Sequence, residues 1–171
     1  MKLRSLTLVA TTLTTLAALS AAHAGHTNIV LQARLDGREE VPAAATDQRI
    51  VGDPDGRGEA YVFGVDGDPL TLCYVLRVDK IQLVATGMAA HIHEGARGGN
   101  GPVVANLAGP FDGNAADCLT EGEMGKFPGN PPGIVQRILD NPAGFYINVH
   151  NPDYPGGAVR GQLEGVTDHT H

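Results

Sequence analysis

Three histidines in strand-like stretches of this 171-residue chain could together bind one metal ion. His91 and His93 are two residues apart in an apolar run, and residues i and i+2 of a strand project from the same face. His150 ends a second strand-like run, over residues 145–150. Three neutral imidazoles suit copper, zinc, nickel or iron far better than calcium or magnesium. The sequence therefore predicts a transition-metal site formed by these three side chains.

The N-terminus has the pattern of a secretory signal. Basic residues precede a charge-free apolar stretch over residues 5–19, and an A-x-A cleavage pattern follows at residues 22–24. The apolar stretch is too short and too rich in threonine for a transmembrane span. We expect removal of residues 1–24 and export to the periplasm or out of the cell. Cleavage after Ala22, which would make His23 the terminal residue, is the alternative.

The expected mature chain, residues 25–171, has the length of one domain. Without Lys2 and Arg4 it carries 10 basic and 19 acidic side chains, a net charge of −9. This excess of acidic side chains argues against a nucleic-acid-binding protein, which carries a basic surface, and disfavours binding to anionic membranes. The expected mature chain also contains no serine, which excludes a serine nucleophile.

Copper is the expected metal, ahead of zinc or another transition metal, because export favours a metal delivered outside the cytoplasm. Three imidazoles suffice for Cu(I), whereas Cu(II) prefers a tetragonal set and needs one more ligand. Water, the chain terminus and His26 are candidates for that ligand, and cleavage after Ala24 would place the Gly25 amino group beside the His26 imidazole. The alternative for His26 is a terminal residue without a ligand role. A second His-x-His pair, His169 and His171, is expected to lie in a frayed tail and to bind nothing.

Cys73 and Cys118 are the two cysteines of the chain. In an exported protein such a pair predicts one disulfide, which would close a loop of roughly 45 residues and stabilise the fold by about 3–4 kcal/mol. Two separate buried thiols are the alternative. A cysteine ligand to the metal is a further alternative, although neither cysteine has a metal-type spacing to a histidine.

Strands must position the histidines, and runs of alternating apolar residues between turn sequences predict such strands. Besides the strand that carries His91 and His93, the predicted strands cover residues 28–35, 59–65, 70–78, 102–107, 145–150 and 158–163. The second and third of these are expected to pair as a hairpin across a turn at residues 66–69. Several short strands of this kind predict an all-β fold, an antiparallel β-sandwich.

Two segments interrupt the strand pattern. Residues 108–133 are acidic and rich in glycine and proline, and we expect a long irregular excursion over the surface. Apolar residues at i, i+1, i+4 and i+5, starting at Ile134, predict one short helix near residues 133–140. The core is expected over residues 28–164, with a frayed tail at residues 165–171.

Several motifs resemble, in order, those of the CHRD (chordin-type) domain. They are Glu39-Glu40-Val41-Pro42, His91-Ile92-His93-Glu94-Gly95 with Asn100-Gly101-Pro102-Val103-Val104, and Tyr146-Ile147-Asn148-Val149-His150 with Pro155-Gly156-Gly157-Ala158-Val159-Arg160-Gly161-Gln162-Leu163. The motifs cover most of residues 28–164. The resemblance implies a single CHRD-type domain of the extracellular or secreted kind, but a family name alone implies no activity.

The histidine pattern is also similar to the copper site of copper-zinc superoxide dismutases, which are Greek-key β-sandwiches. His91 and His93 match that family's His-x-His pair, His150 its later copper ligand, and Arg160 the arginine that guards its copper channel. No histidine lies between His93 and His150, so the bridging histidine and the zinc ligands have no counterparts. The resemblance therefore implies a Greek-key-like topology, a copper-only site, and Arg160 as a catalytic residue that attracts superoxide.

Three polar residues near the histidines have expected roles, and for two of them an alternative stays open. Arg160 would lie opposite Asn148 on the His150 face, or would form an ordinary ion pair with Glu94 or Asp153. Glu94 would hold the free N–H of a ligand imidazole, or would be a solvated loop acid. Asn148 would orient His150 through a hydrogen bond.

The leading functional hypothesis is an exported copper-binding protein with superoxide-dismutase-like redox activity. The alternative is a non-catalytic copper carrier or an extracellular protein-interaction module. A catalytic site predicts an open coordination position with Arg160 directed into it, and a carrier predicts a closed site. An interaction module predicts histidines that do not converge. Glu39 and Glu40 are expected to be structural rather than catalytic.

Overall fold

The structure is a computed structural model and describes residues 29–44, 46–48 and 50–166. The expected signal segment, residues 1–24, the candidate ligand His26 and the tail residues 167–171 lie outside the described residues. The described residues form nine strands, one α-helix and two 3-10 turns. They are β1 (Val30–Asp36), η1 (Gly37–Glu39), β2 (Arg57–Val65), β3 (Asp68–Asp79), β4 (Ala89–Glu94), β5 (Val103–Leu107), β6 (Asn114–Thr120), α1 (Ile134–Asp140), η2 (Pro142–Gly144), β7 (Phe145–His150), β8 (Val159–Gln162) and β9 (Glu164–Gly165).

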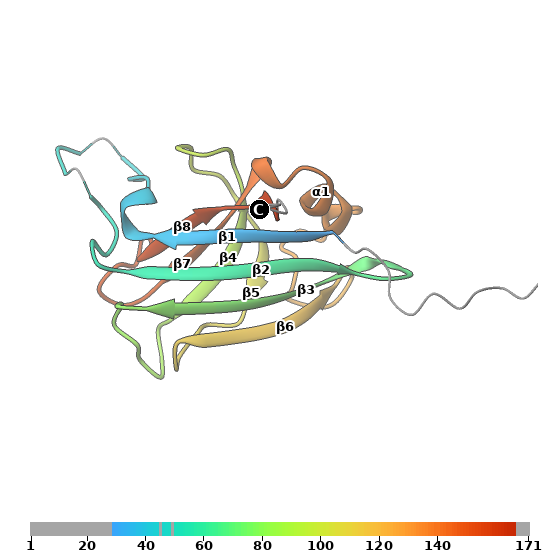
Figure 1. Ribbon diagram of the computed structural model, residues 1–171, viewed down its shortest axis with the longest axis horizontal. Coiled ribbons are helices and arrows are strands. Elements are labelled where there is room, and N and C mark those ends of the chain that lie inside the picture. Colours follow the sequence, from blue (N-terminus) through green and yellow to red (C-terminus); the bar gives the residue numbers. More distant parts are fainter. Residues whose placement is uncertain (1–28, 45, 49, 167–171) are drawn as a thin grey trace, which may run out of the picture.

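The nine strands of the described residues belong to a single antiparallel sheet (Figure 1). Its strand order is β5-β4-β7-β8-β1-β2-β3-β6, and β9 pairs with β1. The sheet curls over, so that the half formed by β1, β2, β3 and β6 faces the half formed by β5, β4, β7 and β8 around the core. The two edge strands are β5 and β6. Read across the gap between them, the strand order is that of a Greek key: β3, β6, β5, β4. The predicted all-β antiparallel fold is confirmed, and one nearly closed sheet supplies both layers.

The candidate ligands lie on the face of the sheet that points away from this core. Successive residues of a strand alternate between the two faces. Four inward residues of β4 and β7 are fully buried: Ala90, Ile92, Ile147 and Val149. The histidines alternate with these residues and therefore project from the opposite face.

Helix α1 has the predicted position and the predicted buried face, formed by Ile134, Val135, Ile138 and Leu139. The Glu121 carboxylate accepts hydrogen bonds from the N–H groups of Gly133 and Val135, both at 2.9 Å, and so satisfies donors at the start of the helix. None of the described helices is long and apolar enough to cross a membrane. Strand β9 brings Gly165 into the sheet, one residue beyond the expected core.

The prediction of an irregular segment over residues 108–133 is wrong for β6, which pairs along β3. Asparagine, alanine and aspartate give β6 a low strand propensity, and Leu119 is its one buried residue. The strand is fixed by its pairing with β3 and by a disulfide between Cys73 and Cys118, which are directly opposed in the two strands. The predicted disulfide is therefore present, and neither cysteine is free to bind a metal.

Candidate metal centre

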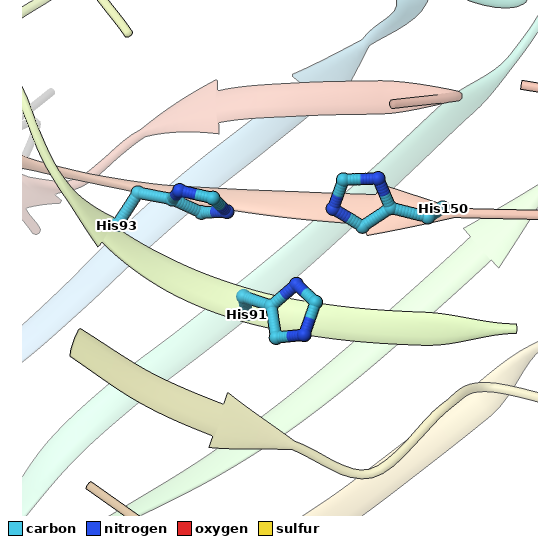
Figure 2. Close-up of side chains that lie close together, drawn as sticks. All are labelled: His91, His93 and His150. Carbon is cyan, nitrogen blue, oxygen red and sulfur yellow. The ribbon is translucent and has the colours of Figure 1, made fainter. Parts of the chain in front are cut away.

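Three histidines come together because β4 and β7 are neighbours in the sheet. The register places Ala89 opposite His150 and His91 opposite Asn148, so the histidines project from one face of two paired strands. Figure 2 shows His91 and His93 on one strand and His150 at the end of the other, with the three rings around a common centre. One donor nitrogen from each ring lies within 4.8 Å of the other two. The residues predicted as ligands are thus brought together.

One nitrogen of each ring is buried and has no hydrogen-bond partner: Nδ1 of His91, Nε2 of His93 and Nε2 of His150. The other ring nitrogen of two of them is held by the backbone. Nδ1 of His93 lies 2.9 Å from the Gly101 carbonyl oxygen, and Nδ1 of His150 lies 3.1 Å from that of Pro155. A carbonyl oxygen only accepts, so both Nδ1 atoms carry the proton and both Nε2 atoms present a lone pair. Three unpaired nitrogens in this arrangement fit the donor set of a transition-metal ion.

Burial lowers the pKa of all three imidazoles, because the charged form loses its hydration. The pKa of His91 falls to about 4 through burial first, and then through repulsion from the His150 and His93 rings. For His93, burial lowers the pKa and the hydrogen bond to Gly101 opposes that change. A metal binds the neutral form of imidazole, so the cluster is in its binding form at neutral pH.

The spacing of the donor nitrogens is slightly wider than in a metal complex. Nitrogen lies about 2.0–2.1 Å from a bound transition metal, which places donor nitrogens about 3.5 Å from one another. The observed limit of 4.8 Å therefore exceeds the bound spacing by about 1 Å.

His93 is supported by two stacked side chains on neighbouring strands, Tyr146 and Arg160. The Tyr146 ring lies parallel to the His93 ring, with an interplanar angle of 9° and 4.8 Å between centroids. The Arg160 guanidinium carbon lies 3.4 Å from the Tyr146 ring centroid. The Tyr146 hydroxyl also accepts a hydrogen bond of 3.2 Å from the N–H of Gly101, the residue whose carbonyl holds His93. Tyr146 therefore fixes both the ring and the loop that orients it.

Arg160 has the predicted register, directly opposite Asn148, but its side chain is not free. It is 2% exposed and donates hydrogen bonds to the Gly99 carbonyl oxygen at 2.6 Å and to Asn100 Oδ1 at 3.2 Å. The charged group thus braces the loop between β4 and β5, the loop that contains Gly101. Neither Glu94 nor Asp153 is among its hydrogen-bond partners. The predicted attraction of an anion by this side chain stays a prediction.

Two predicted supporting contacts are wrong. The Glu94 carboxylate forms an ion pair with Arg137 of α1 rather than with an imidazole. Asn148 does not orient His150; its Nδ2 donates to Glu40 Oε2 at 3.4 Å, and its Oδ1 has no partner. In both cases a backbone carbonyl takes the role expected of a side chain, because loop backbone lies closer to the rings.

A cavity of about 460 Å³ lies over this face of the sheet. His93 and His150 line its floor, together with Tyr146 and Asn148. The loop that follows η1 contributes apolar side chains to its walls, among them Val41, Pro42 and Val51. Two of the three candidate ligands are therefore next to a space large enough for a small molecule.

Glu40 also lines this cavity and is 9% exposed. Burial raises the pKa of its carboxyl to about 8, against the attraction of Arg160 and the hydrogen bond from Asn148, which lower it. Glu40 is therefore protonated at neutral pH. Its Oε1 has no hydrogen-bond partner. The carboxyl packs so tightly against Gly157 that a Cβ atom there would lie 2.5 Å from it.

Sequence reasoning named the three histidines that the structure brings together but missed the residues that surround them. Tyr146 and Glu40 both lie within recognised motifs, yet no pattern distinguishes Glu40, which turns inward, from Glu39, which forms an exposed ion pair with Arg97. The carbonyl groups of Gly101 and Pro155 carry no side-chain signal at all. The sequence shows only that position 101 is a glycine. The structure explains that glycine, since a Cβ there would lie 1.7 Å from the Glu94 carbonyl oxygen.

Comparison with known families gives one match. A family model described as the CHRD domain matches residues 31–163, a range that contains the three clustered histidines and the residues that surround them. Comparisons with curated proteins and with solved structures gave no match.

Proposed function

The chain belongs to the CHRD domain family, and on that premise we propose that it is an exported protein that binds one copper ion through His91, His93 and His150. The observation that carries the proposal is the presence of three buried ring nitrogens, one per histidine, that meet without a hydrogen-bond partner. Buried polar atoms are nearly always paired in proteins, so three unpaired nitrogens at one point call for a ligand.

The chemistry of the donors favours copper. The site offers imidazole nitrogens alone, and among divalent first-row metals such donors bind copper most tightly. Three imidazoles also complete a coordination shell for Cu(I), and for Cu(II) they leave a position for a further ligand. Zinc remains the second candidate, because it accepts three histidines and a water molecule.

Export is supported by the family, whose members are mainly extracellular or secreted modules. The disulfide between Cys73 and Cys118 agrees with it, since disulfides persist in oxidising compartments. Copper suits such a compartment, because outside the reducing cytosol it can change between Cu(I) and Cu(II).

Superoxide dismutation is the most concrete enzymatic form of this proposal. The cavity beside His93 and His150 supports an exchangeable ligand and thus favours catalysis over a closed carrier site. The position of Arg160 does not favour it, because that side chain is buried against Tyr146 and does not line the cavity. A copper carrier is therefore the second candidate. The convergence of the histidines weighs against a pure protein-interaction module.

The test is metal analysis of the mature protein after loading with one equivalent of copper and removal of loosely bound metal. We expect one copper per chain in the wild type and near-complete loss in a His91→Ala, His93→Ala double variant. The matched control is His169→Ala, His171→Ala, which removes the other His-x-His pair and should keep its copper. Equal copper in wild type and the first variant, or loss in the control alone, would reject the site.

A further inference from the structure

Two further buried oxygens without a partner lie beside the three histidines. They are Oε1 of Glu40 and Oδ1 of Asn148, on side chains that are 9% and 5% exposed. Both residues line the same cavity as His93 and His150. Of the six buried unpaired side-chain atoms in the described residues, five therefore belong to this one site.

The metal alone does not satisfy these two oxygens. Glu40 is not part of the group whose donor atoms lie within 4.8 Å of one another, so its carboxyl is set back from the metal position. Asn148 stands opposite His91 in the strand register and two residues from His150, which places it beside the metal position. Each buried polar group without a partner indicates a missing ligand, ion or water molecule. A small molecule bound to the metal would lie next to both residues.

The polar groups of Glu40 and Asn148 define what that molecule must offer. With its carboxyl protonated, Glu40 can donate a hydrogen bond through one oxygen while the other accepts from Asn148 Nδ2. Asn148 Oδ1 can only accept. The ligand must therefore both accept and donate hydrogen bonds, as hydroxyl compounds do.

The charges around the cavity disfavour an anionic ligand. No lysine or arginine is among the described residues that line the cavity, and Arg160 is committed to the loop below. An anion would contact no positive side chain there, and at Glu40 the attraction of Arg160 is outweighed by the cost of burying a charge. The site thus favours an uncharged ligand.

We propose that Glu40 and Asn148 hold the non-protein ligand of the metal, and that this ligand is an uncharged small hydroxyl compound of the class of water and hydrogen peroxide. The proposal rests on metal binding by the three histidines. Glu40 and Asn148 are positioning residues, since they act on the metal through the ligand that they hold.

The test uses the Cu(II)-loaded protein and measures exchangeable protons near copper by electron–nuclear double resonance in H₂O and D₂O. We expect strong proton couplings that disappear in D₂O for the wild type and for Glu40→Gln, which keeps a hydrogen-bonding group of the same shape. Glu40→Leu should lose or markedly change them. Identical couplings in wild type and Glu40→Leu would overturn the proposal.

Azide provides the second measurement, because it is an anion that competes for the same position. We expect Glu40→Leu to bind azide at least tenfold more tightly than the wild type, as it no longer holds the neutral ligand. Equal azide affinity would contradict this. Asn148→Ala is an independent variant with the same expected direction, in case Glu40→Leu does not fold.

Copper content separates the two proposals. If the wild type binds no copper, the proposed function fails and with it this inference. If copper binds with three histidine ligands but Glu40→Leu and Asn148→Ala behave as the wild type, the inference alone fails.

Discussion

The guanidinium group of Arg160 covers the ring of Tyr146, with 3.4 Å between the guanidinium carbon and the ring centroid. A buried cation over an aromatic face is a favourable arrangement, and here it also fixes the loop that carries Gly101. The carbonyl of Gly101 in turn holds His93. Arg160 is therefore coupled to the candidate metal site through the loop that holds His93 rather than through its charge.

Replacement of Arg160 by methionine should destabilise the metal-free protein and weaken copper binding. The variant loses the part-buried hydrogen bonds to Gly99 and Asn100, at a cost of about 2–4 kcal/mol in the free energy of unfolding. Loss of support for a ligand histidine typically lowers metal affinity by about 10–100-fold. Thermal unfolding and copper competition with a chelator measure the two effects.

The matched control is Arg97→Met, in the loop between β4 and β5 that Arg160 braces. Arg97 forms an exposed ion pair with Glu39, and such pairs contribute less than about 1 kcal/mol. Equal losses for Arg160→Met and Arg97→Met would show that Arg160 has no special role.

Relative to a Glu40→Gln variant, the metal-free protein should lose stability as the pH rises from 6.5 to 8. The pKa of Glu40 is raised to about 8, so its folded form keeps a proton that the unfolded form has already lost. Stability from this group is fully present below the unfolded pKa and is lost as the pH rises through the folded pKa. The three histidines, whose pKa values are lowered in the fold, add stability over the same pH range in both proteins. The Glu40 effect is therefore the difference between the two proteins, which should change by about 2 kcal/mol across this window. Urea unfolding at several pH values checks this, and parallel curves for the two proteins would refute it.

Loss of the disulfide should destabilise the fold and leave the metal site intact. A Cys73→Ala, Cys118→Ala variant gives up a closed loop of 45 residues, worth about 4 kcal/mol in the chain-entropy model. The disulfide joins β3 and β6, whereas the histidines lie on β4 and β7. We expect a lower unfolding midpoint with one copper per chain retained. Loss of copper at a temperature where the variant is folded would contradict this separation.

Superoxide consumption by the copper-loaded protein should not slow as salt is added. Attraction of an anion by a positive channel weakens with ionic strength. Here no lysine or arginine lines the described cavity, and the chain carries a net charge of −7. The second-order rate constant should therefore stay level or rise between about 10 and 200 mM salt. A clear fall with salt would restore the channel role predicted for Arg160 from the superoxide dismutase resemblance.

The fold could be predicted from the sequence wherever one face of a strand is apolar. β3 alternates and buries the apolar side chains of one face, Leu72, Tyr74, Leu76 and Val78, and α1 shows its spacing in six residues. β6 escaped prediction because Leu119 is its one buried side chain, and pairing with β3 rather than its own composition makes it a strand.

The candidate site likewise has a part that the sequence predicts and a part that it does not. Same-face spacing placed His91 and His93 together, and the end of β7 brought His150 to them. The environment of the ligands depends on loops that return from distant parts of the chain, so Glu40 and the carbonyl of Gly101 had no local signal. Sequence could name the three histidines that come together, whereas only tertiary structure could show what surrounds them.

The most direct test of the copper site is X-ray absorption at the copper edge of the loaded protein, compared with single His→Ala variants at positions 91, 93 and 150. The account predicts three imidazole nitrogens at about 2.0 Å in the wild type and one fewer in each variant. A wild-type spectrum with fewer than three imidazoles, or three imidazoles retained in any of the variants, would contradict it.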